Sequence, residues 1–176
     1  MKSLKFFLKT GLWILPLAFL VGCGGNKETT PPPCPAVLKI DDASHITKFV
    51  GESEDLTEAT FEAKIDGTRS KCFYTESGIR TELGVQFSAS RAPKFKDEVA
   101  KFQYFIAITG PDHKPLVREV FDAEIDLSSN RVRNIVVDEI EPLIPIKGDV
   151  NGDYYRIYVG LILTEKELAF NRRHPR

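Results

Sequence analysis

The stretch IRTELGVQFSA, residues Ile79 to Ala89, indicates the fold class of this chain. One face of the stretch carries every second residue: Ile79, Thr81, Leu83, Val85, Phe87 and Ala89. The other face carries the polar residues Arg80, Glu82, Gln86 and Ser88. A period of two, with one mainly apolar face and one polar face, is typical of a half-buried β-strand.

Strand-like segments continue on both sides of this stretch. They are ATFEAKI (59–65), KFQYFIAIT (101–109), LVREVFDAEIDL (116–127), RVRNIVVDEI (131–140) and DYYRIYVGLILT (153–164), with a first apolar segment at CPAVLKI (34–40). The turn-forming clusters Gly110–Asp112 and Ser128–Asn130 separate three of them. We therefore expect an all-β fold, an antiparallel immunoglobulin/fibronectin-III-like sandwich of about seven or eight strands.

The C-terminal part gives two local predictions. Residues 143–159 resemble the part of such a sandwich that holds its tyrosine corner, with Tyr155 as the tyrosine. Thr164 and Glu167 have the spacing of a capping box, so a short helical turn with Leu168 to Phe170 should cover one end of the sandwich.

Residues 1–22 differ from the rest of the chain. MKSLKFFLKTG contains Lys2, Lys5 and Lys9 and no acid, and GLWILPLAFLV follows it. A basic region before an apolar run of this length predicts a secretory signal peptide. The apolar run is too short for a comfortable membrane span, and Pro16 in its middle also argues against a span.

The signal ends in Leu20-Val21-Gly22-Cys23, which resembles the lipobox of bacterial lipoproteins. The resemblance implies cleavage before Cys23 and attachment of a diacylglyceryl group to its sulfur. The alternative is a buried or free cysteine near a conventional cleavage site. Gly24 stands where the inner-membrane sorting pattern has Asp, so the resemblance favours the outer membrane over the inner membrane.

Residues 23–35 then form a lipidated, polar, proline-rich tether, and residues 36–176 form a single domain. The protein is thereby predicted to be lipid-anchored in the bacterial cell envelope and to face the periplasm. Two or three acyl chains on Cys23 would hold it stably at a bilayer, because one chain alone binds only marginally.

Cys34 and Cys72 remain after Cys23 is assigned. Export to an oxidising compartment and an even number of remaining cysteines predict a Cys34–Cys72 disulfide. Two buried thiols are the alternative. A metal site is disfavoured because neither cysteine has a CxxC partner or a suitably spaced histidine.

The sequence offers no motif for catalysis, and no cofactor or metal is predicted. A formal net charge of −1 gives no basic field for nucleic acid. His45, His113 and His174 lack the spacing of metal ligands, and surface or loop positions are expected for them. Asp41, Asp42, Ser44 and His45 have the residue types of a triad, but turn or helix capping explains them better. The loop from Asp149 fails the calcium pattern at Tyr154 and Gly160.

A longer resemblance extends over most of the predicted domain. It rests on CPAVLKIDDASHITKF, DLTEATFEAKI, SKCFY, RAP, YFIAI, REVFDAEI and YRIYVGLILTEKELAFNR. These segments are similar to a group of small lipoproteins of alphaproteobacteria with no established activity. The resemblance implies a lipid anchor and one domain, and it names no catalytic residue.

Two hypotheses follow for the function. The first is a non-catalytic, lipid-anchored envelope protein that binds another envelope protein. The second is an envelope hydrolase or small-ligand binder whose site is assembled from residues distant in the sequence.

Overall fold

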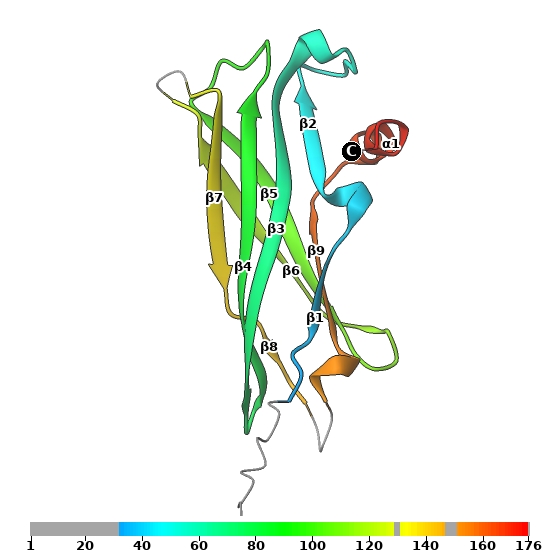
Figure 1. Cartoon of the computed structure of the whole chain (residues 1–176). Coiled ribbons are helices and arrows are strands. Elements are labelled where there is room, and N and C mark those ends of the chain that lie inside the picture. Colours follow the sequence, from blue (N-terminus) through cyan, green and yellow to red (C-terminus); the bar gives the residue numbers. More distant parts are fainter. Residues whose placement is uncertain (1–31, 129–130, 147–150, 176) are drawn as a thin grey trace, which may run out of the picture. The chain divides into compact units, whose positions relative to one another are not determined.

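A computed structural model describes residues 32–128, 131–146 and 151–175, and these residues form an all-β sandwich (Figure 1). The predicted fold class is confirmed. The predicted signal peptide and Cys23 lie outside the described residues.

Two sheets make up the sandwich. The first has the order β1-β9-β5-β6, with β1 Ala36–Lys39, β9 Arg156–Leu161, β5 Val99–Thr109 and β6 Pro115–Asp126. The second has the order β2-β3-β4-β7, with β2 His45–Phe49, β3 Ala59–Thr75, β4 Gly78–Arg91 and β7 Arg133–Ile140. The two-residue strand β8, Leu143–Ile144, also pairs with β4. Every pairing is antiparallel except that of β1 with β9.

The alternating stretch that indicates the fold is strand β4, at the centre of the second sheet. Its apolar face is fully buried at Ile79, Leu83, Val85 and Phe87, each at most 1% exposed. In the first sheet, β5 buries Phe102, Tyr104, Ile106 and Ile108 against that face. The core therefore lies between β4 and β5.

Strand β3 is longer than the predicted strand at residues 59–65, because it continues to Thr75. Its pairing with β4 shifts between Ile65 and Gly67, so Asp66 is an extra residue in a β-bulge. Before the bulge, odd-numbered residues face the core; after it, Cys72 and Tyr74 pack against the core. Phe73 between them is 41% exposed.

The aromatic centre of the core contains one polar pair. The ring of Tyr104 lies 4.8 Å from that of Phe87 and 5.2 Å from that of Phe121. Its hydroxyl donates a 2.8 Å hydrogen bond to Asp138, which points inward from the edge strand β7. Burial, together with the hydrogen bond to Asp138 and its negative charge, raises the pKa of Tyr104 well above its usual range.

Helix α1, Glu165–Arg173, follows the last strand and lies beside β2 and the 3₁₀ turn η1, Asp41–Ala43 (Figure 1). The predicted capping box of Thr164 and Glu167 is present, and the helix runs beyond the predicted turn. The buried Asn171 side chain donates to the carbonyl oxygens of Asp42 and His45. Four ion pairs join the helix to this region: Lys48–Glu167, Lys166–Glu52, Arg172–Asp42 and Arg173–Glu54.

We expect Tyr104→Phe to lower the free energy of unfolding by about 2 kcal/mol, since Asp138 loses a donor in a partly buried site. The pKa of Tyr104 is raised on folding, so its stabilising effect is complete below the unfolded-state pKa of about 10 and declines as the pH rises above it. The difference between the two proteins in urea unfolding should therefore shrink above about pH 10.

Tyr154→Phe is the matched control, because Tyr154 is 59% exposed and should change neither quantity. Equal stabilities for the wild-type chain and Tyr104→Phe at pH 7 would contradict the role assigned to this hydrogen bond.

Candidate functional site

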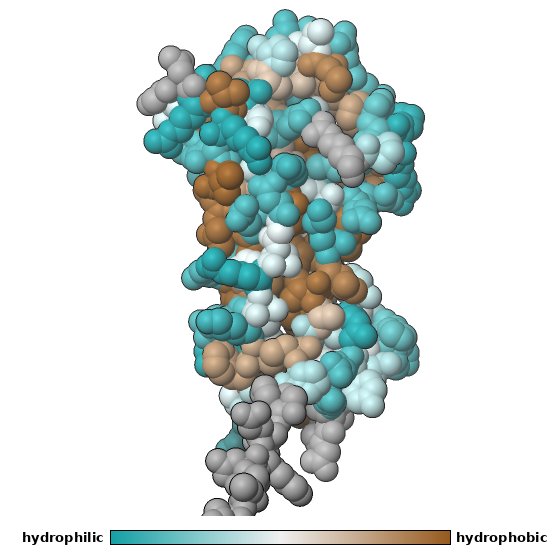
Figure 2. Space-filling view, viewed as in Figure 1, coloured by the Kyte–Doolittle hydropathy of each residue, from teal (hydrophilic) through white to brown (hydrophobic). Residues whose placement is uncertain are grey.

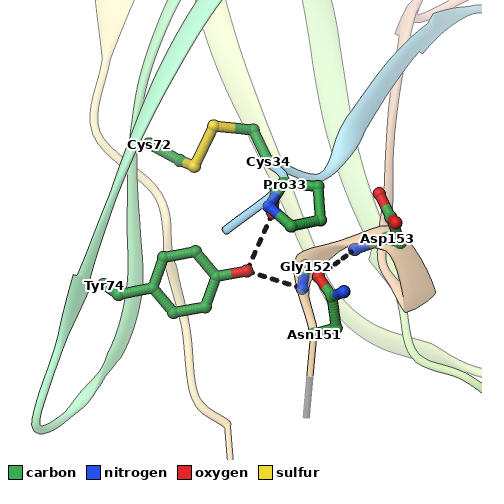
Figure 3. Close-up of a disulfide and its surroundings, with 7 residues drawn as sticks. All are labelled: Pro33, Cys34, Cys72, Tyr74, Asn151, Gly152 and Asp153. Atoms are coloured by element: carbon green, nitrogen blue, oxygen red, sulfur yellow. Dashed lines mark hydrogen bonds between the residues drawn. A yellow bond between two sulfur atoms is a disulfide. The ribbon is translucent and has the colours of Figure 1, made fainter. Parts of the chain in front are cut away.

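The predicted Cys34–Cys72 disulfide is present and fastens the start of the folded domain (Figure 3). Cys34 lies two positions before the start of β1, whereas Cys72 lies in the second half of β3. Their Cα atoms are 5.6 Å apart, although 38 positions separate them in the sequence. The disulfide therefore ties the segment that enters the domain to the second sheet.

Tyr74 makes a second connection at the same place. It follows Cys72 by two positions, so both side chains leave β3 on the same face. The Tyr74 hydroxyl donates a 2.8 Å hydrogen bond to the carbonyl oxygen of Pro33 and accepts a 2.7 Å bond from the N–H of Gly152 (Figure 3). One hydroxyl thus joins the incoming segment to the segment that leads into β9.

Gly152 is required by the close approach of these groups. A Cβ atom at this position would overlap the Pro33 carbonyl oxygen and would lie 2.7 Å from the Tyr74 hydroxyl oxygen. It would also lie 3.2 Å from the Pro35 ring. Any larger residue must displace main-chain atoms, because the carbonyl is not a flexible side chain.

The short 3₁₀ turn η3, Gly152–Tyr154, completes the arrangement. The Asn151 side chain accepts a 3.3 Å hydrogen bond from the N–H of Asp153 and caps the turn (Figure 3). Strand β9 then begins at Arg156, opposite Ala36 in the parallel pairing with β1. We call the group of Pro33, Cys34, Cys72, Tyr74 and Gly152 the tether junction.

Sequence reasoning found the cysteines of the tether junction and missed Tyr74 and Gly152. Tyr155, expected to form a tyrosine corner, is buried in the core at 5% exposure, and Tyr74 supplies the hydroxyl that binds main chain here. The available signal was the spacing Cys72-x-Tyr74, which places the two residues on one face of a strand.

The three histidines are not brought together. His45 is buried at 6% exposure in β2, so its expected surface or loop position was wrong. The stretch HIT has three consecutive buried residues, because its outward side lies beneath α1. His113 lies exposed in the β5–β6 turn with φ 59°, and the His174 ring nitrogen Nδ1 lies 3.0 Å from the Phe170 carbonyl oxygen at the end of α1.

The triad-like residue types at 41–45 have structural roles. The Ser44 hydroxyl donates a 2.8 Å hydrogen bond to the Asp41 carbonyl oxygen at the end of η1. Asp42 pairs with Arg172 of α1 at 2.9 Å. The interpretation of Asp41 and Ser44 as turn residues is therefore supported.

The outer face of the second sheet carries a shallow charged hollow of about 470 Å³. Arg69 crosses Gly84 to reach Glu139, and Arg80 lies 3.3 Å from Glu141. Hydrophilic side chains accordingly cover much of this side of the domain in Figure 2. Lysine and arginine side chains alternate with glutamates around the hollow, so it presents no single sign of charge to a ligand.

Within residues 32–128, 131–146 and 151–175, no three His, Cys, Asp or Glu side chains are placed to hold a metal ion. No helix in the same ranges is long and apolar enough to cross a membrane. The calcium pattern considered at Asp149 begins outside them.

A comparison of the chain with models of known families and with curated proteins finds no match. The tether junction is built from a disulfide, main-chain groups and one phenol. Its chemistry holds two segments in place.

Replacing both Cys34 and Cys72 by Ser should lower the free energy of unfolding by about 4 kcal/mol, from the entropy of the opened loop. Tyr74→Phe should lower the free energy of unfolding by about 1–3 kcal/mol, because the Gly152 N–H loses its acceptor. Urea unfolding measures the stability of the disulfide variant and of Tyr74→Phe, and Ser70→Ala, an exposed change in β3, is the control.

Non-reducing peptide mapping should find Cys34 joined to Cys72. Free thiols at both positions would contradict the junction.

Proposed function

We propose that this chain is a lipid-anchored, non-catalytic protein of the bacterial cell envelope that binds another envelope protein. In this proposal Cys23 carries the lipid, the segment up to Pro33 is the tether, and the sandwich faces the periplasm. Gly24 after the lipidated cysteine favours the outer membrane as the anchoring site.

The observation that carries the proposal is the Cys34–Cys72 disulfide, which lies shortly after the lipobox-like Leu20–Cys23. Structural disulfides persist in oxidising compartments such as the periplasm and are rare in the cytosol. The basic and apolar segment before Cys23 is of the kind that directs export to that compartment. The two features therefore support the same location.

The tether junction suits a domain held by its N-terminal side. A polyproline-like tether of about ten residues would extend about 30 Å at about 3.1 Å per residue. Force on the tether would act on Pro33 and Cys34, which the Tyr74 hydroxyl and the disulfide connect to β3. The force would thus be transmitted to the long β3–β4 hairpin, and the pairing of β1 with β9 would not have to resist it alone.

Exposed apolar side chains on the strands support a binding role. Leu116 and Val120, which share one face of the edge strand β6, are 49% and 45% exposed. Apolar residues that gather on an exposed surface commonly mark sites of protein interaction.

Cys23→Ala should abolish labelling by radioactive palmitate and release the protein from the membrane fraction of intact cells. Cys72→Ala is the matched control, because it removes the disulfide and keeps Cys23. Continued palmitate labelling of Cys23→Ala would refute the lipid anchor.

Crosslinking in intact cells, followed by pull-down and mass spectrometry, should recover one envelope protein reproducibly. The reference is an unrelated lipoprotein expressed at the same level. If no protein is enriched above that reference, the binding role is wrong, whereas the anchor is judged by the palmitate experiment alone.

A further inference from the structure

Strand β7 is an unpartnered edge of the second sheet within the described part of the chain. It pairs with β4 on one side and ends the strand order on the other. Ile135 and Val137 are 50% and 43% exposed on its outer face. Hydrophobic surface at the left margin of Figure 2 overlies the position of β7 in Figure 1. Such an edge is a template for pairing with another strand.

The main-chain groups that face this open edge follow from the pairing with β4. The N–H of Arg91 donates to the carbonyl oxygen of Val132, which identifies that pair as hydrogen-bonded. Because such pairs alternate along antiparallel strands, Val136 also bonds to β4, whereas Ile135 and Val137 direct their main-chain groups outward.

The edge sequence Arg133-Asn134-Ile135-Val136-Val137-Asp138-Glu139 is complementary to itself in the antiparallel direction. A two-fold axis at Val136 would place Ile135 opposite Val137 of a second copy and Arg133 opposite Glu139. These pairs join residues whose main-chain groups both face outward, as hydrogen-bonded pairs require. They match apolar with apolar and positive with negative, which is the stabilising pattern for cross-strand neighbours.

We propose that a second copy of this chain binds antiparallel to β7 and extends the second sheet across a two-fold axis at Val136. The β7 edge is separate from the surface proposed for the envelope partner, and pairing at this edge does not depend on the lipid anchor.

Charge selects the register of this pairing. An axis moved to Val137 would set Ile135 opposite Glu139, and an axis moved to Ile135 would set Arg133 opposite Val137. Both alternatives place a charge against an apolar side chain. The register centred on Val136 avoids that at both pairs.

The charged side chains of β7 already have partners within one copy. Arg133 donates a 3.1 Å hydrogen bond to Ser88 and lies 3.7 Å from Asp66, while Glu139 contacts Arg69. The Arg69–Glu139 pair is exposed on both sides, and such pairs contribute about 0–1 kcal/mol. The Arg133 side chain is half exposed although Asp66 is mostly buried. Both β7 charges can therefore turn to partners across the axis. The inward carboxylate of Asp138 is held by Tyr104 and does not project from the edge.

One device partly protects the edge. The Asn134 side chain accepts a 2.9 Å hydrogen bond from the N–H of Ile135 and donates to the Asp126 carbonyl oxygen. Pairing must displace the first of these bonds, which makes the association weaker than that of a fully open edge. We therefore expect a reversible dimer rather than an open-ended assembly, since a two-fold contact at one edge closes on itself.

Sedimentation velocity of the full chain in mild detergent, over a series of concentrations, should show a dimer that dissociates on dilution. Val137→Lys should weaken the association at least about tenfold, because it sets an ammonium opposite Ile135. Leu116→Lys is the control, because Leu116 is 49% exposed on β6 of the other sheet and should leave the association unchanged. A monomer at all concentrations, or equal losses in both variants, would overturn the proposal.

A charge exchange tests the register. Arg133→Glu and Glu139→Arg should each weaken the dimer, because each sets like charges opposite one another. The double variant R133E/E139R should restore the association, since the opposite charges again face each other. Urea unfolding of the same proteins identifies any loss of folding. A folded double variant that associates no better than the single variants would refute this register.

Discussion

The extra residue in β3 determines whether the N-terminal segment can be connected to the second sheet. Asp66 adds one position to β3 without adding one to β4, and this reverses the side of the sheet to which later residues point. Without the bulge, Cys72 and Tyr74 would face solvent and Phe73 would face the core. The disulfide and the Tyr74 hydroxyl both depend on that reversal. Burial raises the pKa of Asp66, but hydrogen bonds from Lys64 and Ser88 and the charges of Lys64 and Arg133 outweigh it and lower the pKa overall.

The two edge strands of the second sheet each carry a charged, partly buried residue, Lys48 on β2 and Asp138 on β7. Each has a specific partner, Glu167 for Lys48 and Tyr104 for Asp138. The difference between the edges lies in α1, which covers β2 through Asn171. Strand β7 has no helix over it in the described residues, and its exposed side is the one that remains available for contact.

The sequence was informative where one rule acted alone. Alternation identified β4 because both of its neighbours are antiparallel strands and one face is buried, and the capping box located α1 because its signal is local. The disulfide followed from pairing the two remaining cysteines. Alternation failed in β3 because the bulge breaks the period, and in β2 because strand and helix bury opposite faces of three successive residues. Gly152 was not identified, because its requirement arises from Pro33 and Tyr74, which are distant in sequence.

The tether junction and the β7 edge together constrain how a dimer would sit on one membrane. Val136 lies opposite Phe87 in β4 and Cys72 lies opposite Thr81, so each junction is about 20 Å from the proposed axis at about 3.4 Å per residue. A two-fold axis normal to the sheet sends the two junctions in opposite directions along the strands. Under the proposed lipid anchor, the two junctions would be about 40 Å apart along the strands, so tethers of about 30 Å could not reach one bilayer if the strands stood along the membrane normal. The strands would therefore have to incline toward the membrane plane. A lipid-anchored dimer of this kind would therefore present a sheet face, rather than the α1 end, to partners away from the membrane.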